Sequence, residues 1–344
     1  MRFRVELIKT VVLISVLTAS CRRGDDKSAT DTLFTLLSPD NTNISFLNKI
    51  DYTEEFNTYT YRNFYNGAGV GLADLNNDGL IDIYFCSNQT GNKLYLNRGG
   101  FKFEDITEKA GVGCHGSWST GVAIADIDGD GWNDIYVCKS GKPGGQGRSN
   151  ELFINNGNLT FTEKAKDLGL ENLGLSNHAS FFDYDRDGDL DCYLLNNSFR
   201  SVTGFDMNPR QREIPDTLGG NKLFRNDNGH FVDVTKESGI YSSKIGFGLG
   251  VNVADVNRDG WPDIYVSNDF FERDYLYIND RDGTFTESLE DYMTEISQGA
   301  MGADIADLNN DVWPEIYATE MTAEDNARQK TKVLFDTWET YRKE

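Results

Sequence analysis

The sequence contains few of the residues on which catalytic sites usually depend. Among its 344 residues are only three histidines, His115, His178 and His230. No segment has the order of a nucleophile elbow, a zinc-binding cluster or a phosphate-binding loop, and the glycine-rich stretch Gly141 to Gly147 is interpreted as a connector. We therefore expect no catalytic residue. The alternative is a component of an enzyme that acts on a polysaccharide or another polymer.

Basic residues are scarce relative to acidic ones. The chain has 33 lysines and arginines against 55 aspartates and glutamates, which gives a net charge of −22. A nucleic-acid partner would require a basic face, so this balance argues against such a partner. The acidity does not indicate disorder, because 12% aromatic residues and 34 glycines are typical of many short strands joined by turns.

The apolar run near the N-terminus is too short to span a bilayer. Val11 to Leu17 follows basic residues at positions 2, 4 and 9, which is the layout of a secretory signal. Cys21 directly follows small residues and resembles the lipidated cysteine of a bacterial lipobox, with ordinary signal cleavage as the alternative. We expect residues 1–20 to be a lipoprotein-type signal peptide and residues 21–31 to be a polar tether.

These features predict an exported protein. Its lipid anchor would attach it to a membrane, as an outer-membrane lipoprotein on the cell surface or on the periplasmic face. Such a location would permit disulfides, but Cys86 and Cys138 occupy matching places in neighbouring repeats, which is typical of buried core positions. We expect free thiols at these two positions and at Cys114 and Cys192.

One nine-residue pattern occurs five times, at intervals of about 50 to 70 residues. Acidic or amide residues stand at positions 1, 3 and 5, an acidic residue stands at position 9, and the first four copies have glycine at position 6. We name the copies loops 1 to 5: residues 74–82, 126–134, 183–191, 255–263 and 307–315. One copy would be a weak motif, whereas five at near-regular spacing define an internal repeat.

Each loop has the same neighbours along the chain. A strand of small residues precedes it, as at 69–73, and a strand such as 83–85 follows. An Asn-x-Leu-aromatic strand such as 92–95 and a fourth strand such as 103–107 complete the repeat. Four short strands per repeat are typical of a β-propeller blade, whereas a β-sandwich, the structural alternative, does not repeat its loops in this way. We predict an all-β fold over residues 32–325, a β-propeller of five to six four-stranded blades.

The loops have the composition of calcium sites. Hard divalent cations prefer several oxygen ligands from one compact segment, and without a cation the clustered carboxylates would repel one another. Side chains at positions 1, 3, 5 and 9 and the main-chain carbonyl at position 7 can supply these oxygens, and glycine at position 6 permits the positive φ of a sharp turn. The expected ligands are Asp74, Asn76, Asp78, Leu80, Asp82, Asp126, Asp128, Asp130, Trp132, Asp134, Asp183, Asp185, Asp187, Asp189, Asp191, Asp255, Asn257, Asp259, Trp261, Asp263, Asp307, Asn309, Asp311 and Glu315.

The loops differ from an EF-hand, which needs a glutamate at position 12 and flanking helices. Position 12 is apolar in every copy and lies in a β-like run. Loop 5 also departs from the other four, because Val312 replaces glycine and Glu315 replaces the last aspartate. A β-branched residue tolerates positive φ poorly, so we expect loop 5 to be weak or empty and the other four loops to bind calcium well.

Phrases such as Phe64–Val70, Phe181–Gly188 and Tyr275–Asn279 resemble the FG-GAP/VCBS repeat family, and the likeness extends from about residue 33 to residue 324. The resemblance is greatest to bacterial VCBS-repeat lipoproteins, which are similar to extracellular proteins of the CRTAC type and often end in an ASPIC/UnbV domain. This resemblance implies a β-propeller with calcium in the acidic hairpins, as in integrin α-subunits.

The two ends of the repeat region depart from that family pattern. Such propellers usually have six to eight blades, and besides the five loops we expect only a strand pair near Leu33 to Phe46. Residues 326–344 are expected to form a charged tail with helical character and supply no strand to finish the last blade. The expectation is therefore an N-terminal fragment of a longer protein, or a ring that closes unusually.

The function expected from these observations is binding or adhesion at the cell surface or in the periplasm, with calcium in a structural role. The ligand class is protein or glycan. The largest insertion, residues 196–220, carries Arg200, Arg210 and Arg212 on an otherwise acidic chain. We regard these arginines as a candidate partner surface, with a merely solvated insertion as the alternative.

Overall fold

The computed structural model describes residues 33–141, 147–198, 200, 209–270, 272–297, 299–321 and 327. The chain divides into two units, Met1–Asn41 and Thr42–Glu344, and every strand described below lies in the second. The expected signal peptide, Cys21, the tether and nearly all of the expected C-terminal tail lie outside the described residues. In the part of the chain that is described, no helix has both the length and the apolar character needed to cross a membrane.

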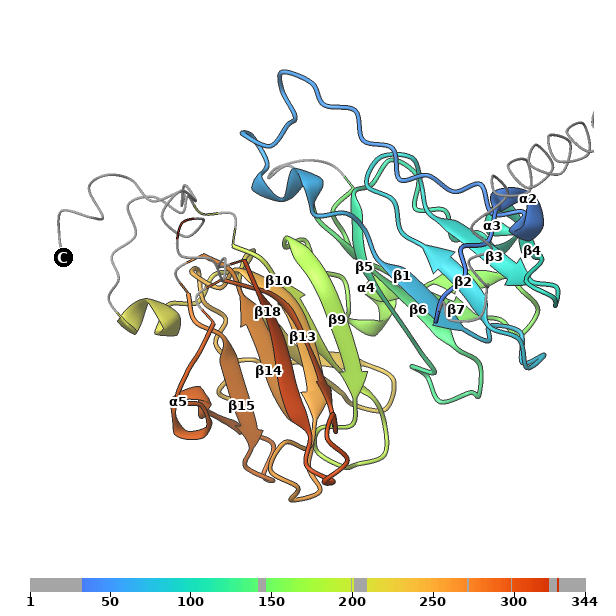
Figure 1. Cartoon of the computed structure of the whole chain (residues 1–344). Helices are drawn as coiled ribbons and strands as arrows, with labels where there is room; N and C mark the ends of the chain where they lie inside the picture. The colour runs from blue at the N-terminus through green and yellow to red at the C-terminus, as the bar shows by residue number, and fades with distance from the viewer. Residues whose placement is uncertain are drawn as a thin grey trace, which may run out of the picture. The chain divides into compact units, whose positions relative to one another are not determined.

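The strands form antiparallel meanders that follow the chain (Figure 1). Loops 1 to 4 each join the first two strands of a four-stranded sheet, and loop 5 joins a pair. The sheets are β1 (Val70–Ala73), β2 (Asp82–Phe85), β3 (Lys93–Asn97) and β4 (Phe103–Asp105); β5 (Ser119–Ala125), β6 (Asp134–Lys139), β7 (Glu151–Asn155) and β8 (Phe161–Glu163); β9 (Ser176–Phe182), β10 (Asp191–Asn196), β11 (Lys222–Asn226) and β12 (Phe231–Asp233); β13 (Gly248–Ala254), β14 (Asp263–Asn268), β15 (Tyr275–Asn279) and β16 (Phe285–Glu287); and β17 (Ala300–Ala306) with β18 (Glu315–Glu320).

The first strands of successive sheets lie side by side, in the order β1, β5, β9, β13 and β17. Their small residues make this approach feasible. A Cβ atom on Gly121 in β5 would lie only 2.3 Å from the carbonyl oxygen of Asn177 in β9, so a larger residue would force these strands apart. Consecutive sheets that meet through their first strands are the arrangement of propeller blades.

The core is divided among the spaces between neighbouring sheets. One apolar cluster joins the first and second sheets and includes Tyr84, Leu94 and Ile135, all fully buried. Further clusters join the second to the third sheet, the third to the fourth, and the fourth to β17–β18. The second, third and fourth sheets each have a neighbouring sheet on both faces, which explains why their second strands β6, β10 and β14 are buried along their whole length.

Helices are short and lie at the ends of sheets. Three single-turn helices follow the fourth strands of the first, second and fourth sheets, and the others lie in connections. Their bounds are α2 (Pro39–Thr42), η1 (Arg62–Tyr65), α3 (Thr107–Ala110), α4 (Ala165–Leu168), η2 (Pro209–Glu213) and α5 (Leu289–Tyr292).

The segment before β1 contacts distant sheets through Arg62. Its guanidinium donates to the Arg200 carbonyl at 2.9 Å and to Asn197 Oδ1 at 3.3 Å. It also lies 4.9 Å from the ring centroids of both Phe247 and Phe270. These contacts connect the N-terminal segment of this unit to the third and fourth sheets, and the acidic composition gave no indication of them.

The prediction of a strand pair near Leu33 to Phe46 is wrong. This region contains only the single-turn helix α2 and no strand among its described residues. Pro39 cannot donate a ladder hydrogen bond, and Asn43 has a φ of 63°, which interrupts an extended backbone. Phe46 nevertheless packs on the first sheet, with its ring stacked 4.7 Å from that of Phe85.

The predicted fold class is confirmed. Four of the five repeats form complete four-stranded antiparallel sheets, and the fifth contributes two strands among the described residues. The fourth strands are shorter than expected, because β4 ends at Asp105 and Thr107 already begins α3. The molecule has the blades of a propeller-like, all-β fold.

Candidate metal centre

The backbone of the five loops follows one conformation. Glycine at position 6 has positive φ in the first four loops, between 82° in loop 1 and 102° in loop 3, as predicted. Val312 adopts the same region with a φ of 75°, so loop 5 has the common turn with an unfavourable residue. Position 4 is also left-handed in every loop, in Asn77, Gly129, Arg186, Arg258 and Asn310.

The carboxylate at position 1 organises each turn. In loop 2, Asp126 Oδ1 accepts the amide of Asp130 at 3.0 Å, and Asp126 Oδ2 accepts the amide of Gly131 at 2.9 Å. The same pair of bonds occurs in loops 1, 4 and 5, and in loop 3 the glycine amide bonds Asp183 at 3.1 Å. These bonds hold the side chains at positions 1, 3 and 5 on the inside of the turn.

The aspartate at position 9 ties each of the first four loops to its own sheet. In loop 2, Asp134 Oδ2 accepts the amide of Ile127 at 2.9 Å, and Asp134 Oδ1 accepts the amide of Asn155 at the end of β7 at 2.8 Å. Equivalent bonds reach an asparagine at the end of the third strand in every complete sheet: Asn97, Asn155, Asn226 and Asn279. All four of these aspartates are fully buried.

The role of these strand-end asparagines as partners of the loops was not predicted from the sequence. Each was visible as a recurring residue at the start of a turn, but nothing in its spacing showed that its amide would meet the loop. In the second and fourth sheets the side chain also reaches back to another sheet. Asn155 Nδ2 donates to the Leu75 carbonyl and Asn279 Nδ2 to the Tyr184 carbonyl, both at 2.9 Å.

Loops 2 and 3 bring their carboxylates closest together. One oxygen from each of Asp126, Asp128 and Asp130 lies within 4.8 Å of the others, and the same holds for Asp183, Asp185 and Asp191. Oxygens on opposite sides of a calcium ion, each about 2.4 Å from it, are separated by about 4.8 Å. The spacing in these two loops therefore fits one hard cation each.

Loop 3 has a second feature that favours a bound cation. One oxygen in each of Asp183, Asp185 and Asp189 is buried without a hydrogen-bond partner within the described part of the chain. A buried carboxylate oxygen that lacks a donor is costly, and a cation would remove that cost. At position 7, Asp189 was expected to offer only its main-chain carbonyl, whereas its side chain also lies among these acids.

Burial and like charge act together on the pKa values of these acids. Burial is the main cause that raises the pKa of Asp134 to about 6 and of Asp191 to about 7, and neighbouring aspartates add to it. Burial and then Asp187 raise the pKa of Asp189 to about 6. The pKa values of Asp128 and Asp185 are raised in the same way. The loops thus disfavour their own full ionisation unless a cation is present.

Loops 1, 4 and 5 differ at position 3, where asparagine replaces aspartate. Its amide donates to the carboxylate at position 5: Asn76 to Asp78 at 3.0 Å, Asn257 to Asp259 at 3.0 Å, and Asn309 to Asp311 at 3.1 Å. This donation satisfies a charge that has no such partner in loops 2 and 3. In all five loops, the calcium site is a prediction.

Two further contacts distinguish loops 4 and 5. The Arg281 guanidinium donates to Asp259 Oδ2 at 2.8 Å. Although burial opposes the change, the amide of Trp261 and this guanidinium lower the pKa of Asp259. In loop 5, Glu315 accepts the amide of Leu308 at 2.7 Å, as the aspartate at position 9 does in the other loops, and it also accepts a bond from Asn309 Nδ2 at 2.6 Å, which has no counterpart there among the described residues. Both contacts use oxygens that a cation would need.

Neighbouring loops also touch one another. Asn77 in loop 1 donates to the Gly131 carbonyl in loop 2 at 3.1 Å, and Asn133 in loop 2 donates to the Asp74 carbonyl in loop 1 at 2.9 Å. Between loops 3 and 4, and again between loops 4 and 5, an arginine at position 4 lies over a tryptophan at position 7. The distances to the ring centroids are 5.0 Å for Arg186 over Trp261 and 4.8 Å for Arg258 over Trp313.

The candidate partner arginines take part in contacts within the chain. Arg200 pairs with Asp216 at 3.2 Å, and Arg212 pairs with the buried Glu272 at 2.6 Å. Arg210 lies exposed in η2 and also interacts within the chain. The Arg212 pair attaches the insertion to the connection between β14 and β15 of the fourth sheet, and the Arg200 pair lies within the insertion, so both arginines have a structural use besides any contact with a partner.

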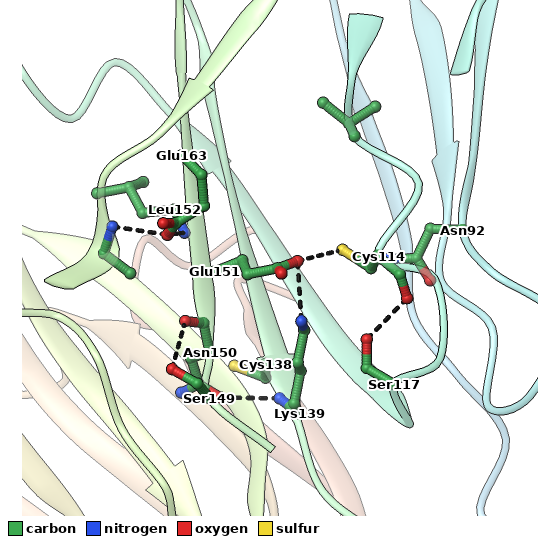
Figure 2. A network of polar contacts seen from close by, with 12 residues as sticks. Asn92, Cys114, Ser117, Cys138, Lys139, Ser149, Asn150, Glu151, Leu152 and Glu163 are labelled. Atoms are coloured by element: carbon green, nitrogen blue, oxygen red, sulfur yellow. Dashed lines mark hydrogen bonds and ion pairs between the residues drawn. The ribbon is translucent and has the colours of Figure 1, made fainter. Parts of the chain in front are cut away.

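The four cysteines in the described residues are buried free thiols, as expected. Figure 2 shows Cys114 between the first and second sheets, where its thiol donates to Glu151 Oε2 at 2.7 Å. The nearly buried Lys139 binds the same oxygen at 2.8 Å. Burial, followed by the charge of Glu151, raises the pKa of the Cys114 thiol well above its ordinary value. The thiol is therefore a protonated donor that helps to join two sheets.

Comparisons with known proteins agree with the repeated pattern of sheets and acidic loops. The model of the FG-GAP-like repeat matches residues 74–137, 214–266 and 255–318, so its matches include loops 1, 2, 4 and 5. Cartilage acidic protein 1 of Xenopus tropicalis is 27% identical over 212 residues, and the human protein is 27% identical over 209. These matches cover 59% of this chain but only 29% and 28% of the relatives, so the chain spans less than a third of their length.

Two solved structures are also similar in part. One is a lectin of Agrocybe aegerita that recognises non-reducing terminal N-acetylglucosamine, with 17% identity, a TM-score of 0.42, and coverage of 76% of this chain and 68% of the lectin. The other is the V. cholerae biofilm matrix protein Bap1, with 14% identity, a TM-score of 0.39, and coverage of 73% and 34%. On the sequence matches and the sheet architecture together, the chain carries FG-GAP-like repeats in a propeller-like all-β fold and is homologous to part of cartilage acidic protein 1.

Proposed function

We propose that this protein is a calcium-stabilised binding module of the exported, lipoprotein type, with a protein or glycan ligand and no enzymatic activity of its own. The observation that carries the calcium role is loop 3, where three carboxylates converge within 4.8 Å and three carboxylate oxygens are buried with no hydrogen-bond partner among the described residues. The residues that would hold the ion are the side chains at positions 1, 3, 5 and 9 and the carbonyl at position 7. The ion would neutralise the loop and stabilise the turn that joins two strands.

A structural role for calcium is favoured over a catalytic one because the same ligand set recurs beside the same strands in every repeat. A catalytic metal would normally appear once, with an open coordination position and a neighbouring acid or base. The histidines give no support to an enzyme: burial lowers the pKa of His178, and His115 pairs with Glu108 at the surface. Export and lipidation rest on Cys21 and the apolar run before it.

Calorimetric titration of the calcium-free chain tests the central proposal. Calcium should bind with a stoichiometry above one and raise the melting temperature, while magnesium at the same concentration should do so much less, because the loops offer many oxygens in a flexible shell. A chain that binds no calcium would contradict the proposal. Export is tested separately, since Cys21→Ala should abolish lipid labelling and release the protein from the membrane fraction.

A further inference from the structure

The aromatic residues of the segment before β1 form two sets, one packed in the fold and one exposed. Phe56, Tyr61 and Phe64 pack around Trp118, with ring centroids 5.0, 5.5 and 5.3 Å from that of the tryptophan. The Tyr61 hydroxyl also donates to Ser140 Oγ at 2.8 Å. Because this cluster is anchored on the second sheet, the segment has a fixed place in the fold.

The second set consists of three exposed tyrosines, of which Tyr65 also contacts the cluster, with its ring edge-on to that of Phe64 at a centroid distance of 4.9 Å. Tyr52, Tyr59 and Tyr65 are 74%, 96% and 64% exposed, although they lie within fourteen residues of one another along the chain. No hydrogen-bond partner for their hydroxyls is found among the described residues. Three large aromatic side chains that are exposed together, beside others that are buried, indicate a surface kept for binding.

A tight turn fixes the backbone between Tyr52 and Tyr59, and Tyr65 follows in η1. Asn57 Nδ2 donates to the Thr53 carbonyl at 2.9 Å and to the Glu54 carbonyl at 3.2 Å, and Asn57 Oδ1 accepts the amide of Tyr59 at 2.8 Å. The amide of Phe56 is bound by the Thr53 hydroxyl at 3.0 Å. The turn is thus organised before any ligand arrives, which lowers the entropic cost of binding.

The tyrosines surround a hollow of about 560 Å³, together with Glu54, Asn57 and two threonines. This volume is in the range of sites for small ligands rather than for protein surfaces. Its lining combines flat aromatic faces with a carboxylate, hydroxyls and an amide. A wholly apolar ligand would desolvate Glu54 without compensation, and a ligand with several anionic groups would meet both this carboxylate and a chain of net charge −22.

We propose that this hollow binds the end of an uncharged or amino-bearing saccharide. The C–H face of a sugar ring packs on tyrosine, and its hydroxyl or amino groups find hydrogen-bond partners in Glu54, Asn57 and the tyrosine hydroxyls. The inference deepens the binding function proposed above by selecting glycan over protein and by locating the site. It rests on the proposed binding function but not on the proposed calcium role, because none of the five loops contributes to the hollow.

The test is a glycan array probed with the full chain in calcium, bearing neutral, N-acetylated, amino and uronic-acid saccharides. We expect neutral or amino saccharides to bind. Tyr59→Ala and Tyr52→Ala should each weaken binding of the best saccharide about tenfold in a direct titration, a typical effect for an aromatic contact at the centre of a site. Tyr65→Phe should retain most of the affinity, since it keeps the ring.

Tyr317→Ala is the matched control, because Tyr317 is as exposed as Tyr65 but lies on β18. It should leave binding unchanged. The proposal is overturned if no saccharide binds, if only uronic acids bind, or if the Tyr52 and Tyr59 variants bind as the wild type does. All variants should keep the calcium-induced rise in melting temperature. Absence of saccharide binding by the wild type with that rise intact refutes this site alone, whereas absence of the rise in the wild type refutes the calcium role alone.

Discussion

Loops 2 and 3 and loops 1, 4 and 5 share a backbone but neutralise their charge differently. In the first group position 3 is an aspartate, and within the described residues the carboxylates converge without a side-chain amide donor at that position. In the second group an asparagine amide donates to the carboxylate at position 5, and in loop 4 Arg281 donates as well. Under the proposed calcium role, a single change of oxygen to nitrogen at position 3 would separate loops that need a cation from loops that can remain folded without one. We expect calcium affinity to follow the same division.

The largest effect is expected from Asp185→Ala in loop 3. In calcium, loss of one site should cost about 2.7 kcal/mol at a hundredfold excess of calcium over its Kd. Without calcium, the same substitution should raise the melting temperature, because it removes one of the crowded carboxylates. Calorimetric unfolding measures the expected loss of stability in calcium and the expected rise in melting temperature in a chelator. Asp311→Ala in loop 5 is the matched control and should leave the calcium-induced stabilisation nearly unchanged, and an equal loss of that stabilisation in the two variants would contradict the division between the loops.

A reciprocal exchange at position 3 sharpens the comparison. Asn76→Asp in loop 1 should strengthen calcium binding by about tenfold, or about 1.4 kcal/mol, because it replaces an internal donor with a ligand carboxylate. Asp128→Asn in loop 2 should weaken binding by a similar factor. Calorimetric titration of the two variants beside the wild type measures the change. If both exchanges leave the isotherm unaltered, position 3 does not control affinity.

A smaller effect is expected at loop 4. Arg281→Ala frees Asp259 from its guanidinium partner, and since exposed ion pairs contribute about 0.5 kcal/mol, calcium affinity at this loop should rise only two- to threefold. Arg98→Ala is a suitable control because Arg98 pairs with Glu104, outside the loops. A weaker affinity in Arg281→Ala would mean that this arginine supports the site instead of competing with the ion.

The smallest effect concerns the backbone of loop 5. Val312→Gly removes a positive-φ strain of about 1 kcal/mol, which the greater chain entropy of glycine offsets in part. We expect a gain of a few tenths of a kcal/mol in the free energy of unfolding, measured by chemical denaturation. The converse change, Gly260→Val in loop 4, should destabilise the chain by about 1 kcal/mol or more. A loss of stability in Val312→Gly would show that the valine side chain has a packing role.

Much of the fold could be predicted because the same pattern of strands and loop recurs in each repeat. The strands around loops 1 to 4 and the positive φ at position 6 follow from local sequence, and they are confirmed. The failed strand pair near Leu33 to Phe46 had no second copy against which to be checked. The crowding in loops 2 and 3, the strand-end partner Asn155 and the contacts of Arg62 could not be predicted, because they depend on how distant segments meet in space.

The contacts between neighbouring loops have a thermodynamic consequence. Loops 1 and 2 are joined by Asn77 and Asn133, while loops 3, 4 and 5 are joined by arginines that lie over tryptophans. Between loops 2 and 3, no such contact is found in the described residues, and position 4 of loop 2 is Gly129, which has no side chain to offer. Nearest-neighbour contacts make binding at one site favour binding at the next. Calcium should therefore bind cooperatively to loops 1 and 2 as one pair and to loops 3 and 4 as another, with weak coupling between the pairs at Gly129.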